Sequence, residues 1–160
     1  FSQRDALREA GELIKLGQYE RALAEVDAYL EERPKDARGR FLKGLILAEQ
    51  KKTDAAIAVF TGLTQDYPEL PEPYNNLAVL YAARGNLERA REALETAVRV
   101  NPKYATAQEN LGDVYARLAV AAYERATALG AGTRAVQAKL RLSRDLVAAG
   151  GRESGAKAVR

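Results

Sequence analysis

Apolar and small side chains recur along this chain at helical spacing, and the same set returns every 34 residues. In the segment 74–81, a tyrosine, a leucine, an alanine and a second tyrosine occupy positions i, i+3, i+4 and i+7, which lie on one face of an α-helix. The same offsets recur in 108–115 and, with fewer apolar residues, in 40–47 and 6–13. Each of these segments is therefore predicted to be a helix with one buried face.

A second helix is predicted in the later part of each period. Pro34, Pro68 and Pro102 mark the period, and twelve residues before each proline there is an alanine, followed four residues later by a bulky apolar residue. These pairs are Ala22 with Val26, Ala56 with Phe60, and Ala90 with Leu94. A small residue one turn before a large one allows two helices to approach closely and interlock. The chain is therefore predicted to be a series of helix pairs.

This arrangement resembles the tetratricopeptide repeat (TPR) family, whose pattern is W-x2-L-G-x2-Y, then A-x3-F, then P. The segment 71–104 matches it best, with Tyr74 in place of Trp, Ala78 in place of Gly and Leu94 in place of Phe. The resemblance implies an all-α fold, a right-handed superhelical α-solenoid whose helix pairs stack because no pair hides its apolar face alone. The full repeats predicted are 3–36, 37–70 and 71–104.

The fourth repeat, 105–129, lacks the turn expected between its two helices. After Gly112 it contains no Gly, Pro or Asn. At 100° per residue, six of its side chains fall within a wedge of about 80°, as one uninterrupted helix requires. They are Leu111, Tyr115, Leu118, Ala122, Ala126 and Leu129. A single long helix is therefore predicted, with its second half projecting past the stack.

The apolar stripe of that helix requires a cover, and two covers are possible. The first is an amphipathic capping helix over 133–148, which gives one TPR domain over 1–148. The residues that give this helix its amphipathic pattern are Val136, Leu140, Ser143 and Val147 together with Leu142 and Leu146. The second cover is another chain. The segment 149–160, with three glycines and three basic residues, is predicted to be a flexible basic tail.

Composition argues against an enzyme. The chain has no cysteine and no histidine, so it lacks thiol nucleophiles, the commonest general base and the commonest zinc ligands. Neither G-x-S-x-G nor G-x-x-x-x-G-K-[ST] occurs. No catalytic residue, no metal site and no cofactor is therefore expected, and no apolar run is long enough to span a membrane.

The net charge of +3 is concentrated at the C-terminal end. The segment 130–160 has seven basic and two acidic residues, which sum to +5, so the residues before it sum to −2. No aromatic residues interleave with these basic residues, and aromatic stacking is what single-stranded nucleic-acid sites use. Nucleic acid is therefore not the expected partner.

In the TPR family the first helix of each pair lines a concave groove, and the resemblance implies which side chains face it. The candidate groove residues are Arg4, Leu7, Arg8, Lys15, Arg38, Phe41, Leu42, Leu45, Asn75, Asn76, Val79, Asn110 and Asp113. The first residues of this set are basic and apolar, which suits an acidic partner segment with an apolar anchor. The Lys/Asn carboxylate clamp of some TPR proteins is not expected, because Leu7 and Leu42 stand at two of its positions.

Asn76 and Asn110 lie one repeat apart on the same predicted face. Asparagine is a poor helix former, and its amide both donates and accepts hydrogen bonds, so the pair suits the backbone of an extended peptide. The alternative is structural, since asparagines near helix starts bond to local backbone.

The function predicted is a non-enzymatic scaffold or adaptor that binds an extended or helical segment of another protein in the concave TPR groove. The alternative is a structural protein that forms homo-oligomers through 105–129 and the C-terminal helix. A chain without cysteine or an initiator methionine resembles exported bacterial members of the family. A periplasmic location is therefore expected rather than a cytoplasmic one.

Overall fold

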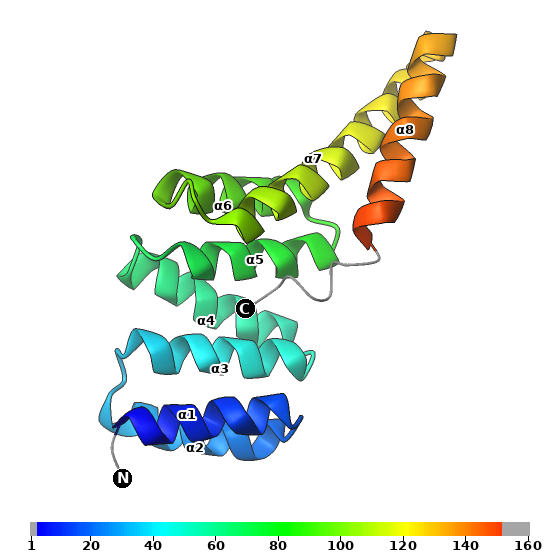
Figure 1. Ribbon diagram of the computed structural model, residues 1–160. Helices are drawn as coiled ribbons and strands as arrows, with labels where there is room; N and C mark the ends of the chain where they lie inside the picture. Colours follow the sequence, from blue (N-terminus) through cyan, green and yellow to red (C-terminus); the bar gives the residue numbers. More distant parts are fainter. Residues whose placement is uncertain (1–2, 152–160) are drawn as a thin grey trace. The chain divides into compact units, whose positions relative to one another are not determined.

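The computed structural model describes residues 3–151, with side chains described from 6 to 150. These residues form helices and connecting turns and no strand, so the predicted all-α fold is confirmed (Figure 1). The chain divides into two compact units, Phe1–Pro73 and Tyr74–Arg160. The single domain expected over 1–148 stays a prediction.

The first unit holds two helix pairs and the start of a fifth helix. Its elements are α1 (Gln3–Lys15), α2 (Tyr19–Glu32), α3 (Ala37–Glu49), α4 (Thr53–Asp66) and the first residues of α5 (Pro71–Ala83). Asp36 defines the start of α3, because its carboxylate accepts a hydrogen bond from the Gly39 N–H at 2.9 Å, as an N-cap does. Each pair thus lies within 34 residues of chain, in agreement with the spacing of the prolines.

The helices of a pair are joined by a tight turn that contains one residue of positive φ. This residue is Gly17 in the first pair (φ 73°), Lys51 in the second (62°) and Gly85 in the third (79°). The three positions are one repeat apart. Glycine adopts a left-handed backbone without a Cβ clash, whereas lysine does not. The second turn therefore carries strain that the other two avoid.

The core of the first unit lies where the helices of one pair meet the next. Ala10, Leu13, Ala22, Val26 and Ile46 form one buried cluster between α1, α2 and α3. The alanines lie one turn before large side chains, so the helices pack as the sequence pattern indicated.

The helices α3 and α4 come close at Gly44. A Cβ placed there would lie 2.6 Å from Cζ of Phe60, which is fully buried on α4. Phe41 packs against Phe60 with its ring turned by 67° and the ring centroids 5.5 Å apart. Phe60 therefore fills the space that Gly44 leaves and also supports Phe41 from behind.

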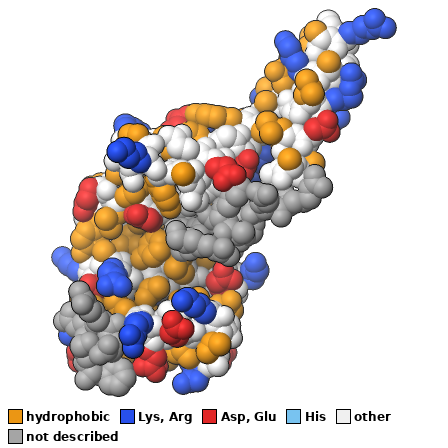
Figure 2. All heavy atoms as spheres, in the orientation of Figure 1, with side chains coloured by type: hydrophobic (Ala, Val, Ile, Leu, Met, Phe, Trp, Pro, Cys, Tyr) orange, Lys and Arg blue, Asp and Glu red, His pale blue; other side chains and the backbone are white. Residues whose placement is uncertain are grey.

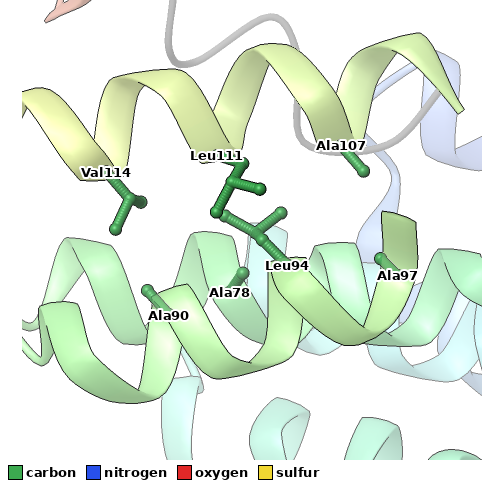
Figure 3. Close-up of a cluster of buried hydrophobic side chains, with 7 residues drawn as sticks. All are labelled: Ala78, Ala90, Leu94, Ala97, Ala107, Leu111 and Val114. Carbon is green, nitrogen blue, oxygen red and sulfur yellow. The ribbon is translucent and has the colours of Figure 1, made fainter. Parts of the chain in front are cut away.

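The second unit continues the pattern and then departs from it. It holds the rest of α5, α6 (Leu87–Val100), α7 (Ala105–Ala126), the π-helical turn η1 (Thr127–Ala131) and α8 (Arg134–Gly151). Its core joins α5, α6 and the first half of α7 (Figure 3). The buried residues there are Ala78, Ala90, Leu94, Ala97, Ala107, Leu111 and Val114.

The helix α7 is continuous where the other repeats have a turn between their two helices, as the sequence predicted. It ends at Ala126 rather than Leu129, because η1 follows and the chain reverses at Gly130 (φ 90°). The predicted apolar stripe is only partly correct. Leu111 is buried, but Tyr115 is 45% exposed and Leu129 is 86% exposed. The buried face instead follows the helices that pack against α7, which are α5, α6 and α8.

The helix α8 runs antiparallel to α7 and covers it. Near the turn, Gln137 donates to the Thr127 hydroxyl at 3.3 Å, and further along Arg144 pairs with Glu124 at 3.0 Å. The two helices form an arm beyond α6 (Figure 1). The capping helix is thus the chain's own cover. It continues to Gly151, so the first part of the predicted tail is helical, and the rest lies outside the described residues.

Candidate functional site

A cavity of about 470 Å³ lies within the first unit, bounded by α1, α3 and the chain that follows α4. A cavity of this size falls in the range typical of ligand pockets. Its lining residues are Leu7, Arg8, Gly11, Glu12, Lys15, Ala37, Arg38, Phe41, Leu42, Leu63, Leu70, Glu72 and Pro73.

Helical spacing explains why these side chains share one cavity. Leu7, Gly11 and Lys15 are four residues apart and therefore lie along one face of α1. Gly11 leaves this wall open, because a Cβ placed there would meet no other atom within 4 Å. On the opposite wall Phe41 is held in place by its contact with Phe60. Phe41 is thus supported from behind, and Gly11 adds no side chain to the space opposite it.

The cavity is apolar inside and charged at its edge. Arg8, Lys15 and Arg38 are exposed and basic, whereas Glu12 and Glu72 are exposed and acidic. Lys15 and Glu12 form an ion pair at 3.4 Å, with 76% and 63% of their side chains exposed, so solvent screens it strongly. Among the residues whose side chains are described, none forms an ion pair with Arg8 or Arg38. These two guanidinium groups are therefore the rim groups best placed to pair with a carboxylate.

The structure brings together six of the candidate groove residues around this cavity. They are Leu7, Arg8, Lys15, Arg38, Phe41 and Leu42. Leu45 is half-buried on α3 and does not line the cavity, and the side chain of Arg4 lies outside the described residues. Binding by the six residues stays a prediction.

Sequence reasoning missed the side of the cavity contributed by the second repeat and the segment after it. Leu63, Leu70 and Pro73 line it there. Leu70 was detectable, because it directly precedes a repeat where the equivalent positions hold Asp36 and Tyr104. An aliphatic residue in a polar connection indicates a buried or lining role.

The asparagines of the second unit differ from the expectation. Asn75 is 0% exposed and Asn76 is 3% exposed, so neither offers its amide to an open groove. Asn110 is half-buried, and its Nδ2 donates to Oδ1 of Asn75 at 2.9 Å. The amide of Asn110 therefore links α7 to α5, which is a structural role.

Val79 and Asp113 complete the candidate set, and both are half-buried. The last turn of α8 lies against Asp113, since a Cβ on Gly150 would be 3.0 Å from its Oδ1. The capping helix thus occupies the space beside Asp113, so this residue does not face an open surface there.

A polar cluster of Glu88, Arg91, Glu95 and Tyr115 joins α6 and α7. Tyr115 donates to Glu95 at 2.8 Å, and Arg91 bonds both Glu95 at 2.9 Å and Glu88 at 3.0 Å. The Tyr115 hydrogen bond, followed by that of Arg91, lowers the pKa of Glu95, and the same bond raises the pKa of Tyr115. The Tyr115–Glu95 bond of this cluster ties α7 to α6 at the helix surface.

The described residues contain no cluster of three or more Asp, Glu, His or Cys side chains suited to a metal ion. In the same part of the chain, no helix combines the length and apolar character needed to cross a membrane.

Comparisons with known proteins identify the repeat. Two sequence profiles, both described as tetratricopeptide repeat, match residues 7–71 and 47–111. No curated protein matches the chain significantly in sequence. Among solved structures, TTC0263, a TPR protein of Thermus thermophilus, is 27% identical with a TM-score of 0.69, over 98% of this chain and 88% of its own.

Two further structures are informative at different levels. YrrB, described as a TPR protein with an unusual peptide-binding site, is 29% identical with a TM-score of 0.61 over 65% of this chain. The chain spans 54% of the length of that protein. MamA of Desulfovibrio magneticus RS-1 is 21% identical with a TM-score of 0.62, over 91% of this chain and 75% of its own, and this likeness concerns the fold alone.

Proposed function

Because the chain belongs to the tetratricopeptide repeat family, we propose that it is a protein-binding scaffold whose first unit receives a partner segment in its cavity. The observation that carries this proposal is the combination of an apolar interior with Arg8 and Arg38 at the rim. YrrB, which shares the fold, is described as having a peptide-binding site.

The partner segment is an extended or helical stretch with one large apolar side chain and a neighbouring carboxylate. The apolar side chain enters between Leu7 and Phe41, where burial removes it from water. The carboxylate pairs with Arg8 or Arg38, whose planar groups bind carboxylates through two parallel hydrogen bonds. Apolar burial supplies most of the affinity in this arrangement, and charge supplies the on-rate and the choice of partner.

A carboxylate clamp of the Lys/Asn type does not fit this cavity. Leu7 is buried in the cavity wall, and Leu42 lines the cavity from α3. A terminal carboxylate at these positions would lie against aliphatic groups and lose its hydration without a hydrogen bond. The partner's charge is therefore placed at the rim, and its apolar group inside.

The test begins with an unbiased peptide library displayed on phage and selected against the full chain. We expect the selected peptides to combine Leu, Ile or Phe with Asp or Glu within about one helical turn. Peptides without that combination, or no selected peptides, would contradict the proposal.

Charge reversal then locates the site. With a selected peptide, Arg8→Glu together with Arg38→Glu is expected to lower affinity at least about tenfold, and the loss should shrink at high salt. The matched control is Lys52→Glu, an exposed reversal in the same unit that does not line the cavity, which should change affinity less than about twofold. An equal loss of affinity in the double variant and in the control would mean that the peptide binds outside the cavity.

A further inference from the structure

The helix α8 has two apolar faces, and only one of them is covered. Leu140 is buried against α7, and Val136, Ser143 and Val147 are half-buried beside it. Leu142 and Leu146 were predicted on the same face, but they are 70% and 58% exposed. A second face therefore points away from α7.

The second face has the composition of a helix–helix seam. At 100° per residue, its side chains fall within a wedge of about 80° on the side opposite Leu140. They are Ala135, Ala138, Leu142, Leu146 and Ala149. Two leucines with alanines on either side permit close approach of another helix. Figure 2 shows apolar side chains on this arm among basic ones.

One edge of this face carries a basic and an acidic side chain. Arg141 and Asp145 lie one turn apart on the same edge, and Asp145 is the only acidic residue in α8. No residue among those with described side chains forms an ion pair with either. Arg144 lies on another side of the helix and pairs with Glu124 at 3.0 Å.

We propose that this face binds the same face of a second copy of the chain, with the two α8 helices antiparallel. A two-fold axis near residue 144 places Leu142 of one copy against Leu146 of the other. In an antiparallel pair equivalent edges meet, so Arg141 of each copy lies beside Asp145 of the other, and the two ion pairs are symmetric. The contact therefore uses both leucines of this face and the Arg141 and Asp145 side chains of its edge.

Charge distinguishes a second copy from other occupants. An anionic lipid surface would attract the basic residues of the arm, but it would bring the Asp145 carboxylate against headgroups of the same charge. An acidic protein helix would likewise oppose Asp145. A second copy supplies an oppositely charged partner for both Arg141 and Asp145.

The size of the face predicts a weak dimer. At 1.5 Å per residue the 18 residues of α8 extend about 27 Å, so one helix pair buries less than the roughly 800 Å² per partner typical of stable complexes. Dissociation constants of about 10⁻⁵ to 10⁻⁴ M are therefore expected. This inference goes beyond the proposed scaffold function, since two copies carry two cavities and gain avidity for a bivalent partner.

Sedimentation velocity from roughly 5 to 500 μM tests the proposal with the full chain. The unmodified chain is expected to shift from monomer to dimer, and Leu142→Ser with Leu146→Ser should remain monomeric with an unchanged circular dichroism spectrum. Leu16→Ser is the matched control, because Leu16 is 70% exposed on the other unit, and it should dimerise like the unmodified chain. A monomer at all concentrations, or dimers in the Leu142/Leu146 variant, would overturn the proposal.

Charge exchange tests the antiparallel arrangement. Arg141→Asp alone and Asp145→Arg alone should each weaken the dimer at least about fivefold, because each places like charges together. The double variant Arg141→Asp with Asp145→Arg should restore association to within about threefold, since the ion pairs re-form with exchanged partners. Failure of the double variant to recover would exclude this pairing. Leucine-dependent binding to phosphatidylserine vesicles by a strictly monomeric chain would assign the face to lipid instead.

Discussion

Gly44 and Gly112 occupy the same position of the 34-residue repeat, yet their surroundings differ completely. A Cβ on Gly44 would lie 2.6 Å from the ring of Phe60, whereas a Cβ on Gly112 would meet nothing within 4 Å. Gly44 faces a second helix that folds back against it. Gly112 lies on α7, which has no such partner at that place. A small residue is thus needed at this repeat position only where the second helix of the repeat packs against the first.

The second half of the fourth repeat shows the same difference. Ala56 and Phe60 are fully buried in the second repeat, whereas the equivalent positions of the fourth hold Glu124 and Ala128, which are exposed. The turn positions at 17, 51 and 85 have positive φ, and the next one in the series, Ala119, lies inside α7. The fourth repeat therefore keeps the first helix of the pair, and α8 packs against α7 in place of the second helix.

The largest effect is expected from breaking the continuous helix with Ala119→Pro. Proline removes one backbone hydrogen bond and clashes with the preceding turn, so the arm should lose at least about 3 kcal/mol. Hydrogen exchange should show lost protection in the second half of α7 and in α8, with protection kept in the first unit. Ala119→Gly is the graded control at about 1 kcal/mol. Loss of protection throughout the chain would mean that the arm belongs to a single cooperative core.

Gly44→Ala and Gly112→Ala sharpen the comparison directly, because they are the same change at the same repeat position. Gly44→Ala forces Phe60 to move and should lower the free energy of unfolding by about 1–3 kcal/mol. Gly112→Ala adds no contact and removes glycine's backbone entropy, so it should raise stability by about 0.5–1 kcal/mol. Chemical denaturation of the two variants measures the difference. Equal signs would show that the fourth repeat packs like the second.

The smallest effect concerns the turns that the fourth repeat lacks. Lys51→Gly should stabilise the chain by about 0.5–1 kcal/mol, because it relieves a left-handed lysine. Gly17→Lys, the reciprocal change one repeat earlier, should destabilise by a similar amount. Thermal unfolding of both variants provides the measurement. A destabilised Lys51→Gly variant would mean that the lysine side chain contributes more than its backbone conformation costs.

For the candidate site, the TPR resemblance identified one wall of the cavity and misjudged the amides. Leu7 and Arg38 were predicted because the resemblance implies that the first helix of each pair lines the groove. Asn75 and Asn110 were assigned to a partner, but they bond to each other at 2.9 Å. Helical periodicity gives the direction of a side chain on its own helix. Helical periodicity does not show which other helix packs against that side chain.

The amino-acid sequence by itself determined the helix pairs, their period and the continuity of α7, because turn residues and helical spacing act over a few neighbouring positions. Only the tertiary structure decided which faces are covered: that Leu140 is buried while Leu142 is exposed, and that Leu70 and Pro73 complete the cavity. Burial depends on packing between segments far apart in the chain, and the repeat pattern is the same whether or not a neighbouring helix is present.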